Sequence, residues 1–380
     1  MVTELNPFVY DDPLPPNALV NRDEETRHLL ALAEGGHNTR LSAPRRYGKT
    51  SVILRVLAEA DRAGLNTVHV DFYRCVTRAE AARRIEEAYL ARLAGPLRRT
   101  VSALTRSWQT RLKLGAGGVT LQAEHARELG NQRLADLLDL PKRIFAKSAT
   151  RTVVAFDEFQ DFLRIGEGLD GLLRSKIQLH RDEASYVFAG SEPGMLDELF
   201  NRKGRPLFDQ ARPIPLGPLA GDDLAEHIGT HFESSGRDPG VALDLLVDLA
   251  RGHPQRAMLL AHHLWEHTSR GQAADEETWQ SALQAVDRET RERFERTWFD
   301  LGSAPSQRRV LAALANSPGS LYSAASLLAF DLSKAAAQQA ARALVYVGDV
   351  TRIDGRIIIV DPLFERWLQR TQQGLPETAG

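Results

Sequence analysis

The chain has 380 residues and a mass of 42.2 kDa, which predicts two or three domains. Its 48 basic and 50 acidic residues give a net charge of −2, so the overall charge does not call for a polyanionic partner. A composition of 43% hydrophobic and 26% charged residues is typical of a globular protein and excludes a disordered or fibrous one.

Two features bear on the compartment. Cys75 is the one cysteine, which excludes an intramolecular disulfide and a zinc site built from cysteines, and it fits a reducing compartment. No stretch approaches the roughly 18 apolar residues of a membrane span, and residues 1–16 lack the layout of a signal peptide. We therefore expect a soluble cytoplasmic protein with no membrane partner.

The first half of the chain alternates short apolar runs with helical patterns. Residues 1–20 are rich in Pro and Asn and predict an extended arm along the next domain. A helix over 24–35 follows, and Gly35 and Gly36 end it. Strands that alternate with helices predict an α/β fold with a parallel sheet covered on both faces. The expected strands lie at 38–43, 67–72, 152–156, 186–189 and 213–216.

Residues 95–140 interrupt this alternation, and we interpret them as an insertion. Within it, the sequence LKLGAGGVTLQA predicts a small hairpin around Gly115–Gly118. Residues 218–300 show helical patterns only, with a break at 252–254. Three further helical patterns and a predicted hairpin around Asp354–Gly355 indicate a winged-helix domain, because Asp-Gly favours tight turns.

The most informative segment is a Gly-Lys-Thr motif between the first expected strand and a helical pattern. It follows the P-loop pattern except that Ala43 stands at the first Gly position. Gly48 lets successive N–H groups point inward, Lys49 supplies a cation to the phosphates, and the Thr50 hydroxyl is placed to bind Mg²⁺. The predicted nucleotide-binding residues are Ala43, Pro44, Arg45, Arg46, Tyr47, Gly48, Lys49, Thr50 and Ser51.

Two carboxylates end the apolar run Val-Val-Ala-Phe, as in a Walker B motif. Asp157 would hold Mg²⁺ directly or through water, and Glu158 would orient and polarise the attacking water. Asp71, which ends the second expected strand, fits the magnesium shell or a turn equally well. Gln160 and Asp161 follow the motif without an assigned role.

Two later positions could also serve a nucleotide. Ser191 follows the fourth expected strand, where it could reach the γ-phosphate or the attacking water, or cap a helix. Pro254 could pack on a purine base and Arg256 could reach a phosphate. The alternative for both is an ordinary helix-breaking loop with a surface arginine.

A metal site built from histidines is a further alternative. His263 and His267 lie four residues apart on an expected helix, with Glu266 adjacent, and His262 is spaced four residues from Glu266. The sequence has no His-Glu-x-x-His pattern. A solvated or partly buried helix face is therefore the favoured interpretation.

Together these motifs resemble the prokaryotic ATPase family often called archaeal-type ATPases. This family belongs to the AAA+/STAND group of P-loop proteins, near origin-recognition-type ATPases. The resemblance spans nearly the whole chain. The segments that carry it are 6–8, 20–25, 43–50, 156–160, 189–193, 252–254 and 360–367.

The resemblance implies a P-loop ATPase core with sheet order 5-1-4-3-2, a helical lid and a C-terminal winged-helix domain. It implies ATP and Mg²⁺ as cofactors. Asn21 and Arg22 would line the adenine side of the site, and Pro254 would lie in the lid against the base. The expected domains are an arm (1–20), a core (21–217), a lid (218–300), a winged helix (301–372) and a tail (373–380).

One departure from the family bears on the rate. The family often has an arginine in a Pro-Leu-Tyr-Gly-Arg stretch, and Gln210 stands at that place in Pro-Leu-Phe-Asp-Gln. An arginine finger contributes about 10³–10⁵ in rate where one is used. We therefore expect slow ATP hydrolysis and a nucleotide-dependent conformational switch.

DNA binding through the winged helix is the alternative function. Residues 301–380 carry eight Lys and Arg and six Asp and Glu, so their net charge is only +2. The expected recognition helix, 333–345, is largely alanine. DNA binders usually show a clearer basic stripe, so a protein partner or self-association is at least as well supported.

Overall fold

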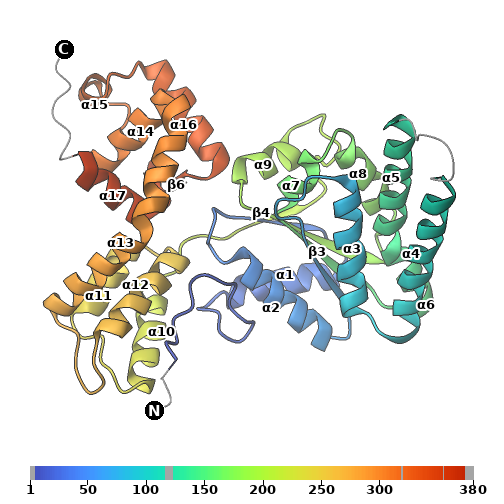
Figure 1. The fold of residues 1–380 in the computed structure, drawn as a ribbon, viewed down its shortest axis with the longest axis horizontal. Helices are drawn as coiled ribbons and strands as arrows, with labels where there is room; N and C mark the ends of the chain where they lie inside the picture. Colours follow the sequence, from blue (N-terminus) through green and yellow to red (C-terminus); the bar gives the residue numbers. More distant parts are fainter. Residues whose placement is uncertain (1–4, 116–122, 318–319, 354, 373–380) are drawn as a thin grey trace. The chain divides into compact units, whose positions relative to one another are not determined.

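The computed structural model describes residues 5–115, 123–317, 320–353 and 355–372, and the chain divides into two compact units. The core unit comprises Pro15–Ala43 and Lys49–Leu216. The C-terminal unit comprises the residues before Pro15, the short segment Pro44–Gly48, and the residues from Gly217 onward. Figure 1 shows the elements of both units.

The core unit is built on one five-stranded sheet in which each strand pairs with its neighbours in parallel. Its strands are β1 (Thr39–Ser42), β2 (Asn66–Asp71), β3 (Thr152–Asp157), β4 (Ala184–Gly190) and β5 (Arg212–Pro215). They lie in the order β2-β3-β4-β1-β5, which is the predicted order 5-1-4-3-2. The predicted α/β fold class and strand order are confirmed.

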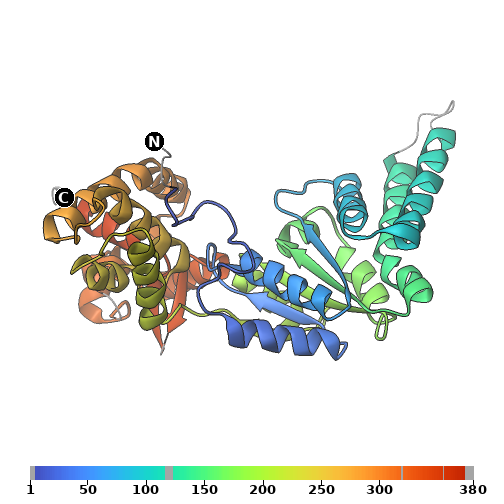
Figure 2. The same cartoon turned by 90° about the horizontal axis from the view of Figure 1, so that it is seen from below.

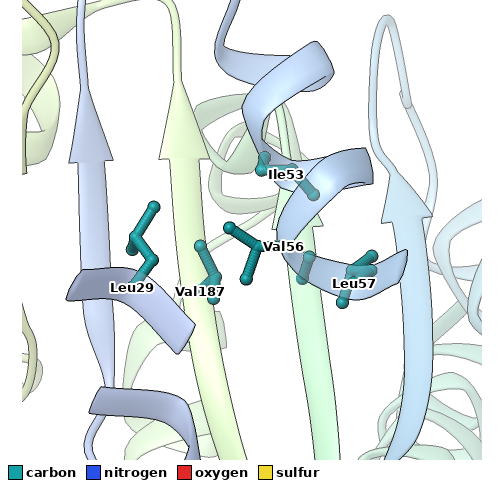
Figure 3. A pocket seen from close by; sticks show the side chains of 6 residues that line it. Leu29, Ile53, Val56, Leu57 and Val187 are labelled. Carbon is teal, nitrogen blue, oxygen red and sulfur yellow. The ribbon is translucent and has the colours of Figure 1, made fainter. Parts of the chain in front are cut away.

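One face of the sheet is covered by α1 (Asp23–Glu34) and α2 (Lys49–Arg62). Side chains alternate between the faces of a strand, and on this face β3 presents Ala155 and β4 presents Val187. Figure 3 shows the seam between helices and sheet, which also contains Leu29, Ile53, Val56 and Leu57. All these residues are apolar, so the seam is part of the core and is not the nucleotide site.

The opposite face carries an aromatic cluster. The Phe159 ring lies 4.8 Å from the Phe188 ring of β4, and the Phe188 ring lies 5.2 Å from Phe200. Phe156 of β3 packs against both Phe159 and Phe188. The helices of this part of the core are α3 (Arg78–Arg92), α6 (Leu140–Ser148), α7 (Phe159–Arg164), α8 (Leu169–Ile177) and α9 (Pro193–Asn201).

The insertion is helical. It contains α4 (Gly95–Gly115) and α5 (Ala123–Leu138), which Figure 2 shows side by side. Trp108 Nε1 of α4 donates a 3.0 Å hydrogen bond to Asp136 Oδ2 of α5. The predicted hairpin is wrong over residues 112–115, which continue α4, and its next residues, 116–122, lie outside the described residues.

Residues 218–300 are mainly helical, as predicted. They form α10 (Gly221–Ser234), α11 (Ala242–Ala250), α12 (Pro254–His267) and α13 (Glu276–Asp300). Helix α12 packs against α10, α11 and α13. Trp265 of α12 donates to Ser235 Oγ at 2.8 Å, beyond the end of α10, which fixes one end of this group.

The N-terminal arm packs on these helices. Phe8 is buried against the rings of His231 and Phe232 in α10. Asn6 Nδ2 donates a 3.0 Å hydrogen bond to the backbone oxygen of His262 in α12. The expectation that the arm follows the adjacent domain is therefore wrong for these residues, because the aromatic anchor has its partners more than two hundred residues along the chain.

The C-terminal segment, defined here as residues 305–372, contains helices and one hairpin. Its elements are α14 (Pro305–Asn316), α15 (Ala324–Ala329), α16 (Lys334–Val347), β6 (Val350–Ile353), β7 (Arg356–Ile359) and α17 (Pro362–Gln372), preceded by a short turn, η1 (Leu301–Ser303). The hairpin is antiparallel, with Val350 opposite Ile359. Its Asp354 lies outside the described residues.

Membrane insertion through a helix has no support in the described part of the chain. None of the helices there combines the length and the apolar character that crossing a bilayer requires.

Candidate functional site

The Gly-Lys-Thr loop connects β1 to α2, as the motif predicts. Gly48 has a φ of 81°, a left-handed conformation that glycine adopts without a steric penalty, and an added Cβ would meet no atom within 4 Å. Arg46 has a φ of 67°. Helix α2 begins directly after the turn, at Lys49. The turn therefore ends at a helix N-terminus, where backbone N–H groups are available to an anion.

Lys49 is buried at the start of α2. Its Nζ donates a 2.9 Å hydrogen bond to the backbone oxygen of Ala43, the residue at the first position of the motif. The side chain thus folds back along the loop, which holds the ammonium group beside the backbone that the motif predicts to bind phosphates.

Thr50 and Asp157 contact each other directly. Thr50 Oγ1 donates a 2.6 Å hydrogen bond to Asp157 Oδ2. Thr50 lies in the first turn of α2, and Asp157 ends β3, so elements more than one hundred residues apart bring the two predicted magnesium ligands together. The contact depends on the neighbouring positions of β3 and α2 in the core unit.

His69 of β2 is a neighbour of this pair that the sequence did not reveal. Its Nε2 lies 3.6 Å from Asp157 Oδ2, beyond ordinary hydrogen-bond distance. Burial raises the pKa of Asp157, but the His69 imidazole and the Thr50 hydroxyl lower it by more, so the carboxyl stays ionised.

The Thr50–Asp157 pair fits Mg²⁺, which prefers hard oxygen ligands such as a carboxylate and a hydroxyl. Asp71 is placed differently, because its Oδ1 accepts a 2.8 Å hydrogen bond from the backbone N of Tyr73 and forms a turn. In the described residues no group of three or more His, Cys, Asp or Glu could hold a metal ion. Magnesium commonly completes its coordination with waters and phosphate oxygens.

Glu158 and Ser191 meet at the ends of β3 and β4. Ser191 Oγ donates a 2.7 Å hydrogen bond to Glu158 Oε2. Gln160 Nε2 donates to the same carboxylate oxygen and, at 3.3 Å, to Ser191 Oγ. Glu158 has a φ of 47°, a strained conformation for a residue with a side chain, and such conformations cluster at functional sites.

Gly190 makes the position of Gln160 possible. A Cβ at Gly190 would lie 2.4 Å from Gln160 Oε1 and 3.2 Å from Leu196 Cδ1. Both distances are shorter than ordinary van der Waals contact. The glycine before Ser191 therefore leaves the space in which Gln160 reaches the Glu158–Ser191 pair.

Asn21 and Arg22 lie directly before α1, both in left-handed conformations with φ of 52° and 74°. Arg55 of α2 donates to the backbone oxygen of Asn21 at 3.3 Å. Arg22 pairs with Glu25 at 2.7 Å. The turn is thus attached to α2, the helix that carries Lys49 and Thr50.

Pro254 and Arg256 open α12 in the C-terminal unit. Pro254 occupies the first turn of the helix, and His253 caps it by accepting from the backbone N of Arg256 at 3.3 Å. The Tyr47 ring, in the same unit, packs edge-on against His253 at 5.0 Å. Arg256 forms an ion pair with Asp361 of the C-terminal segment.

Gln210 and Arg205 both make contacts within the core unit. Gln210 Nε2 donates to the backbone oxygen of Phe208 at 3.2 Å. Arg205 pairs with Glu198 of α9. The side chain at the family's arginine position is therefore neutral and is bonded to its own loop.

The histidines of α12 make contacts typical of a helix surface. His263 Nε2 lies 2.7 Å from Glu289 Oε2 of α13, and His267 Nδ1 contacts the backbone oxygen of His263 at 2.7 Å. These contacts agree with the solvated or partly buried helix face that the sequence favoured.

Solved structures with a similar fold cover nearly the whole chain. The Walker-type ATPase PABY2304 of Pyrococcus abyssi matches with a TM-score of 0.69 and 17% identity, over 95% of this chain and 99% of that one. The Aeropyrum pernix ORC2 protein in ADPNP-ADP complexes matches with a TM-score of 0.56 and 15% identity, over 97% and 99%. Its ADP form gives 0.51 and 15%, over 96% of each chain.

The core has the P-loop AAA+ fold. This likeness agrees with the resemblance to archaeal-type and origin-recognition-type ATPases that the motifs indicated. No protein-family model matches the chain, and no curated protein matches it either.

Proposed function

We propose that the chain binds Mg-ATP and acts as a nucleotide-dependent conformational switch that hydrolyses ATP slowly to ADP and phosphate. The observation that carries the proposal is the 2.6 Å contact between Thr50 of the Gly-Lys-Thr loop and Asp157 at the end of β3. In a P-loop fold these are the hydroxyl and the carboxylate expected to hold magnesium. The likeness to solved ATPase structures supports it.

Each site residue has a role in this proposal. Loop residues 43–51 surround the phosphates with N–H groups, and Lys49 contributes its charge. Thr50 and Asp157 hold Mg²⁺, which neutralises charge on the phosphates. Asn21 and Arg22 line the adenine side, while Pro254 contacts the base and Arg256 a phosphate. The domains of the switch are the arm (1–20), the core (21–217), the lid (218–300), the winged helix (301–372) and the tail (373–380).

Hydrolysis requires a base for water. Glu158 Oε2 accepts hydrogen bonds from Ser191 and Gln160, which fix the orientation of the carboxylate. The other oxygen, Oε1, is the atom that would orient water and accept its proton. Ser191 is a positioning group for Glu158 and, in this proposal, also contacts the γ-phosphate or the water. Gln210 brings no positive charge to the transition state, which supports slow turnover.

The test compares binding and turnover of wild type, Lys49→Ala and Glu158→Gln. Equilibrium binding of a fluorescent ATP analogue is measured beside phosphate release at millimolar Mg-ATP. We expect wild type to bind and turn over, Lys49→Ala to lose binding, and Glu158→Gln to bind without turnover. Wild type that binds no nucleotide, or Glu158→Gln that turns over at the wild-type rate, would contradict the assignment.

DNA binding by the C-terminal segment remains the second proposal. Lys334, Gln338 and Arg342 are exposed at four-residue intervals on α16, whose opposite face is buried alanine and leucine. A salt titration of duplex binding tests it, since phosphate contacts make affinity fall steeply with salt. With only two basic residues in the stripe we expect a shallow slope, and a slope near zero would favour a protein partner or self-association.

A further inference from the structure

Arg256 of α12 is buried and ion-paired with Asp361, the residue directly before α17. Its Nε donates to Asp361 Oδ1 at 2.8 Å, and its Nη2 donates to Asp361 Oδ2. Its Nη1 is buried and has no hydrogen-bond partner among the described residues. An arginine presents five N–H groups, so the guanidinium keeps capacity for another acceptor after Asp361 is bound.

A second arginine, Arg293, lies near the same aromatic ring as Arg256. Arg256 and Arg293 lie 5.6 and 5.0 Å from the centre of the Phe294 ring in α13. Arg293 Nη2 is also buried without a hydrogen-bond partner in the described part of the chain. Burial lowers the pKa of Arg293 to about 10, and the positive charge of Arg256 adds to the effect. Three arginines, Arg46, Arg256 and Arg293, thus act on one another here, against the two carboxylates of Asp361 and Glu289.

Asp361 has a second function in the same place. Its Oδ1 accepts hydrogen bonds from the backbone N of Leu363 at 3.1 Å and of Phe364 at 3.2 Å. The carboxylate that binds Arg256 is therefore also the cap that starts α17. Displacing it from Arg256 would move the beginning of α17.

Another ion pair connects the end of α11 to α17 without involving Arg256. Arg251, at the end of α11, donates to Glu365 Oε2 at 2.6 Å. Glu365 lies one helical turn after Asp361, so the Arg251–Glu365 and Arg256–Asp361 ion pairs are similar in position and chemistry. Only the Asp361 pair, however, uses an arginine that we assign to phosphate binding.

We propose that Asp361 is an internal competitor for phosphate at Arg256 and Arg293. A phosphoryl group, with several oxygens and a larger negative charge, takes the place of the carboxylate, and Arg293 supplies the second guanidinium. Phosphate binding and the attachment of α17 through Asp361 then exclude each other. This inference rests on the proposed function for its nucleotide source, while free phosphate offers the same chemistry. In the proposed switch, this competition makes the C-terminal segment the part of the chain that changes position.

The first experiment uses Asp361→Asn in the full chain, with Glu365→Gln as the matched control. Asparagine keeps a side-chain oxygen that can cap α17, but it removes the charge that competes for Arg256. We expect Asp361→Asn to bind a fluorescent Mg-ATP analogue at least about fivefold more tightly than wild type. Glu365→Gln should bind within about twofold of wild type. Equal affinities for the two variants would overturn the proposal.

The second experiment follows hydrogen exchange of α17. Mg-ATP should increase exchange in wild type, and Asp361→Asn should already exchange faster without it. Adding Arg293→Gln to Asp361→Asn should reverse the gain in affinity, an effect that a purely structural arginine would not produce. If Mg-ATP binds to wild type and α17 exchange does not change, the competition is wrong while the nucleotide site stands.

The third experiment separates the two sources of phosphate. Inorganic phosphate at millimolar concentration is added to Lys49→Ala, which should not bind nucleotide. Faster α17 exchange there shows that phosphate alone displaces Asp361. A response to Mg-ATP in wild type with none to inorganic phosphate assigns the site to the nucleotide. A response to neither overturns the inference, even if wild type binds no nucleotide. Should Asp361→Asn fail to fold, Asp361→Ser replaces it, since serine also caps helices.

Discussion

The proximity of Glu158 and Ser191 could be predicted from their positions at the ends of two strands. Both follow parallel strands, and the carboxyl ends of parallel strands share one edge of a sheet, so the sequence could place them near each other. It could not show that Gln160 completes the group. The contact depends on the left-handed conformation of Glu158 and on the missing side chain of Gly190. His69 was missed because a single polar residue inside an apolar run gives no signal.

Gly190 offers a test of that group. Gly190→Ala would place a Cβ 2.4 Å from Gln160 Oε1, so Gln160 must move away from Glu158 and Ser191. We expect ATP turnover to fall about tenfold or more, because positioning of a general base contributes about 10²–10⁴. ATP affinity should change little. Phosphate release and analogue binding measure the two effects.

Gly171→Ala is the matched control for that substitution. Gly171 lies inside α8, and an added Cβ meets no atom within 4 Å. This substitution should leave ATP turnover unchanged and stabilise the protein slightly, by about 0.5–1 kcal/mol. Equal losses of turnover in the two variants would show that Gln160 is not needed.

His253 predicts a pH dependence of stability. Burial lowers its pKa to about 3 in the folded protein, against about 6.5 for an unperturbed histidine. The unfolded chain therefore binds a proton that the folded chain excludes, and stability falls as the pH drops from 6.5 toward 3. His253 lowers the free energy of unfolding by at most about 1.4 kcal/mol for each pH unit in this range.

The variant His253→Asn isolates this contribution. Asparagine can still accept the hydrogen bond from the backbone N of Arg256, so the cap of α12 is kept. Urea unfolding between pH 7 and 4 should give a shallower slope than wild type, by up to one proton. An unchanged slope would mean that His253 is protonated in the folded state. His227, whose pKa burial lowers to about 4, should keep part of the slope in both proteins.

At the scale of elements, the strands were predictable and the insertion was not. Apolar runs ended by polar residues mark the buried strands of a parallel sheet with little ambiguity. The stretch around Gly115 has apolar and polar residues in alternation, and glycines follow, so it fits a hairpin. The same residues also continue the helical pattern of α4, and tertiary packing of α4 on α3 and α6 decided the outcome.

The aromatic cluster should dominate the stability of the core unit. Phe159 is fully buried and contacts Phe156, Phe188 and Phe200. Phe159→Ala should cost about 3–5 kcal/mol of unfolding free energy, which urea unfolding measures. Phe208 lies in the same unit but is 38% exposed, so Phe208→Ala is the control and should cost much less. Similar losses for both would mean that the cavity is filled by rearrangement.

At the scale of the whole molecule, the proposed nucleotide binding should increase the free energy of unfolding. A ligand that binds only the folded protein adds about 2.7 kcal/mol at a concentration of 100 times its Kd. Mg-ATP should therefore raise the urea midpoint of wild type and leave that of Lys49→Ala unchanged. A rise in both proteins would place ATP somewhere other than the Gly-Lys-Thr loop.

The units are discontinuous along the chain, which composition and periodicity could not reveal. Local patterns report neighbours in sequence, whereas the arm and the Arg256–Asp361 pair join residues far apart. The motif resemblance identified Asn6–Phe8 and 360–367 as meaningful segments. Their partners became visible only in the folded chain.

The placement of Phe8 has a consequence for synthesis on the ribosome. The arm leaves the exit tunnel before the core unit does, and α10, which buries Phe8, is made only after the entire core unit. At about 5–20 residues per second, this apolar anchor stays uncovered for roughly 10–45 s. Phe8 therefore stays accessible during that interval, and an N-terminal fusion that keeps it from reaching α10 should lower the yield of folded chain.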